Sequence, residues 1–128
     1  MTTIQKLQQI YLIEPGEFAD LLGCSEPTVK RWEEKCPQKV EFLAEVLIDY
    51  QLQYFLLWGE YLKAPQTKVS GVFIKMRKSL DMTQVDMYRA MRVCRDTIER
   101  YDRDILPSYI DNLSYLIVDI HEEIKSCL

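Results

Sequence analysis

The feature that most constrains the fold of this chain is an internal repeat. The segment TVKRWEEKCP, residues 28–37, aligns with TIERYDRDILP, residues 97–107, at an offset of 69 residues. Each segment begins with a threonine, Thr28 or Thr97, and Trp32 of the first aligns with Tyr101 of the second. Hydrophobic class is kept over most of two segments of roughly 45 residues. We therefore expect two related units in tandem.

Both units show helical hydrophobic spacing. Between residues 39 and 63, apolar side chains recur in steps of three and four, which predicts one long helix. Shorter amphipathic helices are expected over 3–12 and 72–80, and a last helix from about Ser108. No segment reads as a strand, so the predicted fold class is all-α.

Capping residues mark where these predicted helices begin and end. Gly23 suits the left-handed position that follows a helix. Ser25 and Thr83 are good N-caps for the helices after them, and a further helix is expected to begin at Cys94 or Arg95.

The predicted domain boundary lies in a segment that contains Pro65 and Gly71. We assign 1–64 to the first unit, 65–71 to a linker and 72–128 to the second unit. The apolar run from Phe55 to Leu62 exceeds what a small domain easily buries. Part of that surface is expected to contact the second unit or another chain.

The segment EFADLLGCSEPTVKRWE, residues 17–33, carries a recognisable combination. It has a small Ala19, a turn glycine at 23, a buried aliphatic Val29 and the pair Trp32-Glu33. With these residues the chain resembles the Xre family, the Cro and phage-repressor type of helix-turn-helix. The resemblance covers most of the chain. It implies two tandem repressor-like helix-turn-helix units, each followed by a long apolar helix, with the third helix of a unit entering the DNA major groove.

The second unit resembles the family at its contact positions. The resemblance implies that Arg77 pairs with Asp102 and that Gln84 grips a phosphate at a helix N-terminus. It places Arg95 at the first base-reading position, where a guanidinium can bond guanine bidentately. Asp96 follows it and could accept a hydrogen bond from cytosine.

The second unit departs from the family at two positions that shape the fold. Tyr88 stands where the first unit has Ala19, so a bulky ring is expected to push the two motif helices apart. Arg92 stands where the first unit has Gly23, and a left-handed arginine costs on the order of 1 kcal/mol.

The first unit instead departs at contact positions. Gln8 replaces the helix-1 arginine, and Pro15 replaces the phosphate-gripping glutamine. Glu26 and Pro27 occupy the base-reading positions. The first unit thus keeps the family's fold-forming residues, and the second keeps its DNA-contacting residues.

The charge distribution follows the same division. The chain carries a net charge of −4, yet residues 68–103 hold nine basic and five acidic side chains. We expect this basic region to bind DNA, the alternative being a solvated basic face. The residues expected to contact DNA are Arg95, Asp96, Arg100, Gln84, Arg92, Lys75 and Lys78, with Arg89 beside them, and Lys30, Arg31 and Lys35 in the first unit.

The sequence disfavours several other classes. Its one histidine, His121, lies far from the cysteines, and these form no C-x-x-C pair, so we expect no metal site. There is no Gly-rich phosphate loop, nucleophile elbow or carboxylate cluster, so we expect neither an enzyme nor a cofactor. The chain has no apolar run that could span a membrane and no basic leader before an apolar block, which predicts a cytoplasmic protein.

The expected function is therefore a transcriptional regulator that binds a double-stranded DNA operator. We expect it to be a repressor, of the kind that a phage or mobile element carries. A homodimer is expected, with a single-chain pseudo-dimer on an asymmetric site as the alternative. The competing class is a protein-interaction module, such as an antirepressor, antitoxin or inhibitor. The overall acidity and Glu26-Pro27 favour that class, and the basic second unit opposes it.

Overall fold

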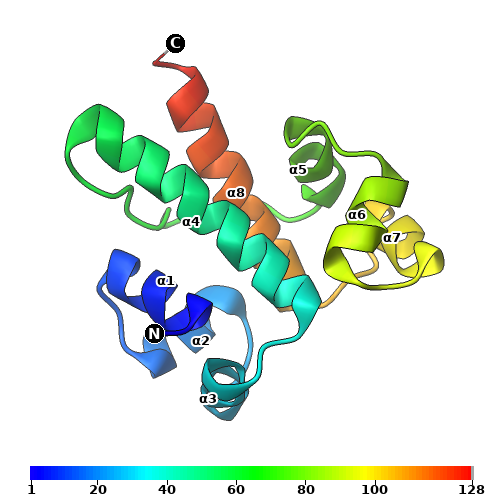
Figure 1. The fold of residues 1–128 in the computed structure, drawn as a ribbon, viewed down its shortest axis with the longest axis horizontal. Coiled ribbons are helices and arrows are strands. Elements are labelled where there is room, and N and C mark those ends of the chain that lie inside the picture. The colour runs from blue at the N-terminus through cyan, green and yellow to red at the C-terminus, as the bar shows by residue number, and fades with distance from the viewer. Residues whose placement is uncertain (128) are drawn as a thin grey trace.

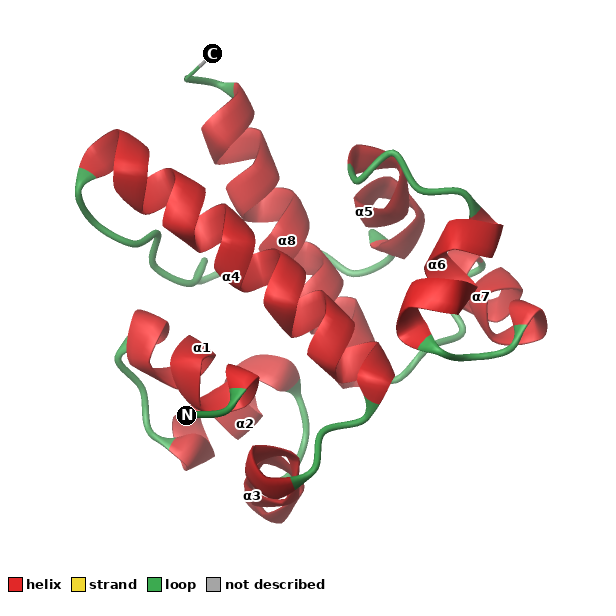
Figure 2. Cartoon of the chain, in the orientation of Figure 1, coloured by secondary structure: helices red, strands yellow, loops and turns green. Residues whose placement is uncertain are grey.

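The computed structural model describes residues 1–127, and these form eight α-helices without a strand (Figures 1 and 2). The all-α prediction is confirmed. The first half comprises α1 (Thr3–Tyr11), α2 (Pro15–Leu22), α3 (Glu26–Glu34) and the long α4 (Gln38–Trp58). None of the helices in the described part of the chain is long and apolar enough to cross a membrane.

The second half repeats this order of three short helices and a long one. Its helices are α5 (Phe73–Ser79), α6 (Gln84–Met91), α7 (Arg95–Asp102) and α8 (Ser108–Lys125). Helices α2 and α6 begin and end 69 residues apart, from residue 15 to 22 and from residue 84 to 91. We call residues at this offset equivalent.

The turns recur as well as the helices. Gly23 after α2 and Arg92 after α6 are equivalent, and both take left-handed φ angles, of 76° and 54°. The amide of the next residue then bonds back into the helix, from Cys24 to Ala19 O and from Val93 to Tyr88 O. The second half therefore makes the glycine turn with an arginine in place of the glycine.

The long first-half helix is shorter than predicted. It ends at Trp58, because Gly59 takes a left-handed φ of 75° and stops it. The chain then folds back along α4, where the buried Gln51 amide donates to Leu62 O and accepts from Leu62 N, both at 2.9 Å. The prediction that 59–63 continue the helix is wrong, since this buried amide holds the segment in a loop.

The long helices α4 and α8 pack against each other at the centre of the molecule (Figure 1). Each also contacts a short helix of the other half. Asn112 of α8 donates to Leu22 O at the end of α2 (2.7 Å), and Gln38 of α4 donates to Ala90 O of α6 (3.1 Å). Buried side chains from both halves form one hydrophobic cluster, so the assigned linker joins two units that share a core.

An aromatic pair connects α3 with the central helix α8. Trp32 of α3 packs edge-on against Tyr109 of α8, with ring centroids 5.0 Å apart. The Lys39 ammonium of α4 lies 5.6 Å from the Tyr109 ring centroid. Trp32 and its equivalent Tyr101 are both buried, and the Tyr101 ring packs edge-on against Phe73 of α5, with centroids 5.3 Å apart.

Candidate nucleic-acid interface

The start of α6 is fixed by a reciprocal cap. The Thr83 hydroxyl accepts from the Asp86 amide at 3.1 Å, and the Asp86 carboxylate accepts from the Thr83 amide at 3.0 Å. The hydrogen bond from the Thr83 backbone lowers the pKa of Asp86 below its usual value. Such a capping box satisfies two amides at the helix end and holds Gln84 as the first helical residue.

Arg77, Asp102 and Gln84 form one partly buried network behind that helix end. Two Arg77 nitrogens donate to the two Asp102 oxygens at 3.3 and 2.9 Å, and a third donates to Met82 O at 2.9 Å. The Gln84 amide donates to Asp102 Oδ2 at 2.8 Å. The network therefore ties together the beginning of α6, the middle of α5 and the end of α7.

A shallow hollow of about 530 Å³ opens over this network. Three cationic side chains line it, from Arg77, Lys78 and Arg103, together with Gln84 and the carboxylates of Asp102 and Glu99. Lys78 and Arg103 are exposed, so their charges face solvent. An anion in the hollow would meet these cations beside a helix N-terminus, which is itself partially positive. The sequence prediction left out Arg103, although its charge lies within the basic region.

Helix α7 lines the hollow through Glu99 and Asp102, and it begins one turn before Glu99, at Arg95. Arg95 is its first residue, with a side chain 69% exposed, and pairs at 3.3 Å with Glu99, which lines the hollow. Asp96 follows and is exposed. A cation at a helix N-terminus opposes the helix dipole, and Arg before Glu is the weaker order for such a pair. Arg95 therefore stands where helix stability does not favour it.

The other predicted contacts of the second half lie on α6, α7 and the turn between them. Arg100 is exposed one turn beyond Asp96, and its guanidinium donates to the Thr97 hydroxyl at 3.4 Å. Arg92 is exposed in the turn, and Arg89 is exposed in the last turn of α6. Lys75 lies elsewhere, since its ammonium pairs with Glu122 of α8 at 2.6 Å and does not line the hollow.

Cys94 is the N-cap residue of α7, and its thiol is exposed. Its sulfur lies 3.0 Å from the Thr97 hydroxyl, and this hydrogen bond lowers the pKa of the thiol. Cys24 is half-buried, and burial raises the pKa of its thiol. The described residues contain no cluster of His, Cys, Asp and Glu that could hold a metal ion.

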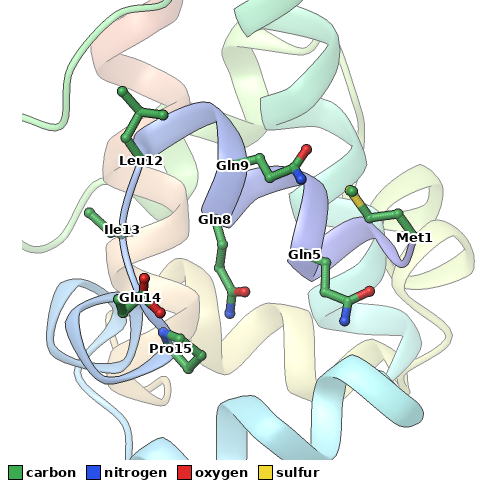
Figure 3. A pocket seen from close by; sticks show the side chains of 8 residues that line it. All are labelled: Met1, Gln5, Gln8, Gln9, Leu12, Ile13, Glu14 and Pro15. Atoms are coloured by element: carbon green, nitrogen blue, oxygen red, sulfur yellow. The ribbon is translucent and has the colours of Figure 1, made fainter.

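The first half has an equivalent hollow of about 680 Å³ with different chemistry (Figure 3). Gln5 and Gln8 project from the same side of α1, and Pro15 lies where the chain enters α2. Glu14 adds a negative charge, and no lysine or arginine lines this hollow. The Gln8 amide donates to Glu33 at 3.1 Å, where the second half has the Arg77–Asp102 ion pair.

The start of α3 inverts the charges found at the start of α7. Glu26 and Lys30 pair at 3.4 Å, in the positions equivalent to Arg95 and Glu99. Lys30, Arg31 and Lys35 are exposed on α3 and at its end, so the predicted first-half cations lie apart from the basic hollow.

Compared with protein-family models, with curated proteins and with solved structures, the chain gives no match.

Proposed function

We propose that the chain binds double-stranded DNA sequence-specifically and acts as a transcriptional regulator. In this proposal α6 and α7 act as a helix-turn-helix pair, α7 enters the major groove, and the first half is a second unit of the same kind. The basic hollow between the N-terminus of α6 and the C-terminal part of α7 is the observation that carries the proposal.

The phosphate backbone would be held at the hollow. Lys78 and Arg103 supply free positive charge there, and the first turn of α6 supplies backbone N–H groups. The Gln84 side-chain amide, which donates to Asp102, also lines the hollow and could donate to the same phosphate. These contacts would fix the position of α7 on the duplex without reading sequence.

Sequence would be read by Arg95. An exposed arginine at the first residue of a helix can bond both O6 and N7 of guanine. Its pair with Glu99 is exposed, so the guanidinium can exchange that carboxylate for a base at little cost. Arg100 and Asp96 would complete the contact surface of α7.

We propose that the protein is a repressor, because a protein bound to its operator can block transcription without a further activity. The exchange of contacts between α4, α8 and the opposite halves favours a protein that acts as a single chain. A homodimer would need a further face, which the exposed end of α4 could supply.

The test is binding of a selected DNA duplex at several salt concentrations. Affinity should fall steeply with salt, since neutralised phosphates release counterions. Arg95→Ala should weaken binding to the selected duplex by about 1–3 kcal/mol and relax the preference at one base pair. Lys125→Ala, an exposed cation at the far end of α8, is the matched control and should leave affinity unchanged.

A protein-interaction module is the second candidate. Leu52, Phe55 and Leu56 are exposed on α4, and Leu56 is 85% exposed. A largely apolar hollow of about 720 Å³ lies nearby, between the end of α1 and the loop after α4. Such surfaces commonly mark partner sites. Failure to enrich any duplex at low salt would exclude the DNA proposal and leave this one.

A further inference from the structure

We infer that only the second half engages DNA, that Glu26 closes the first half to phosphate, and that the target is a single asymmetric half-site. This inference rests on the proposed function. It concerns which of the two similar helix pairs carries the binding, and it makes one side chain responsible for the difference.

The Glu26 carboxylate lies against the first turn of α2. A Cβ atom added to Gly16, the second residue of that helix, would lie only 3.3 Å from Glu26 Oε2. In the second half, the equivalent place at the first turn of α6 is where a DNA phosphate would approach. Glu26 therefore puts the protein's own anion where the second half would accept one from DNA.

Two more carboxylates surround the same helix end. Glu14 is the N-cap of α2, and the Glu17 carboxylate accepts from the Glu14 amide at 3.3 Å. The three equivalent positions in the second half hold Thr83, Asp86 and Arg95. Three acids thus stand where the second half has one acid and one cation, so a phosphate is repelled from α2 and attracted to α6.

The remaining first-half cations do not compensate. Lys30 pairs with Glu26 itself, at 3.4 Å, and Arg31 and Lys35 lie farther along, in the last turn of α3 and at its end. The adjoining hollow is lined by glutamines where the second half has Arg77 and Lys78. The first half therefore keeps the helix pair without a surface that suits a polyanion.

The DNA target follows from this difference. Two working units on one duplex would occupy half-sites about 10 base pairs apart, with related sequences. A chain with one working unit needs only the half-site under α7, and its preferred sequence should lack an inverted repeat.

Paired thiol labelling tests the inference directly. A random duplex of about 30 base pairs, long enough for two half-sites, is first selected with the unaltered protein. The native thiol of Cys94 then reports on α7 in a Cys127→Ser background. Ser25→Cys, added to Cys94→Ser and Cys127→Ser, places a thiol at the equivalent cap of α3.

Selected DNA at about ten times its Kd should slow alkylation of Cys94 about tenfold, in proportion to the occupied fraction. The thiol introduced by Ser25→Cys should react at the same rate with and without DNA. Equal protection of both thiols would overturn the inference while leaving the proposed function intact. If no duplex is enriched, both fail together.

A second pair of positions avoids the caps. Lys30→Cys and Glu99→Cys stand at equivalent exposed or half-exposed sites one turn into α3 and α7. In the background with Cys94→Ser and Cys127→Ser, DNA should protect the thiol at position 99 and not the thiol at position 30. This pair decides the question if Ser25→Cys disturbs folding.

A gain-of-function variant tests the role of Glu26. Glu26→Arg with Lys30→Glu gives α3 the charge pair of α7, and should steepen the plot of log affinity against log salt by about one phosphate contact. Glu26→Gln, which removes only the charge, should strengthen binding at low salt. Weaker binding by Glu26→Gln would show that Glu26 contacts DNA and would refute its closing role.

Discussion

Gln8 and Arg77 occupy equivalent positions on α1 and α5, and each bonds the acid near the end of the third helix of its half. In the first half this is one amide contact with Glu33 at 3.1 Å. In the second half it is a two-pronged ion pair with Asp102, which also receives Gln84. The same architectural position is thus filled by a weak neutral donor in one half and by a buried charge in the other.

The comparison teaches that turns and apolar positions can preserve a helix pair while its surface chemistry changes. Gly23 and Arg92 make the same turn. At the start of the next helix, however, Glu26 and Lys30 exchange signs with Arg95 and Glu99. Backbone geometry and surface charge are therefore separable properties in this chain, and each can be perturbed in one half with the other as control.

The largest expected effect comes from Arg77→Met. It leaves Asp102 buried without its cation, and we expect a loss of about 3–5 kcal/mol in the free energy of unfolding. The equivalent Gln8→Met removes one hydrogen bond and should cost about 1 kcal/mol. Urea unfolding monitored by circular dichroism measures both. Equal losses would show that the ion pair is no more important than the amide contact.

The turn residues should respond in opposite directions. Gly23→Ala puts a Cβ in a left-handed residue, 2.9 Å from Asn112 Nδ2, and should destabilise the protein by about 1–3 kcal/mol. Arg92→Gly relieves the equivalent strain and should stabilise by about 0.5 kcal/mol, after the entropy cost of glycine. Thermal unfolding of the two variants checks the signs, and a stabilised Gly23→Ala variant would contradict the turn assignment.

The two helix caps should differ by a smaller amount. Ser25 accepts from the Thr28 amide, whereas the equivalent Cys94 makes no such side-chain cap. We expect Cys94→Ser to stabilise the protein by about 0.5–1 kcal/mol and Ser25→Ala to cost about 1 kcal/mol. Denaturation midpoints measured under reducing conditions give both values. A destabilised Cys94→Ser variant would mean that the thiol contact with Thr97 outweighs a hydroxyl cap.

The smallest effect on stability accompanies the largest loss of proposed function. Arg95→Glu with Glu99→Lys gives α7 the favourable charge order of α3, and should stabilise by about 0.3–1 kcal/mol. The same variant should lose binding to the selected duplex. Unfolding and binding are measured on one preparation, and unchanged DNA affinity would remove Arg95 from the proposed contact surface.

Much of the helical scaffold could be predicted because its signals are local. Ser25 and Thr83 precede helices that begin at the next residue, and Pro15 is the first residue of α2. Gly23 takes the left-handed φ that its position after α2 predicts. The end of the long first helix was missed, since it depends on Gln51 binding a segment eleven residues further along the chain.

The candidate interface could be predicted only in part. The basic region and Arg95 follow from sequence, but Lys75 belongs to the same charge count and is paired with Glu122 of α8. Arg103 was overlooked, and only the fold brings it beside Lys78 around one hollow. Whether a charge in a basic region is available to a ligand depends on neighbours that lie far away in the sequence.

The sequence by itself determined the helices, most of their ends and the repeat of 69 residues, because hydrophobic spacing, caps and turns act over a few residues. Tertiary structure alone decided that α4 and α8 join the halves in a single core, and that Glu26 lies against the beginning of α2. Those outcomes depend on distances between separate helices. Electrostatic contacts of a few ångströms are set by such packing, and no local pattern in the chain encodes them.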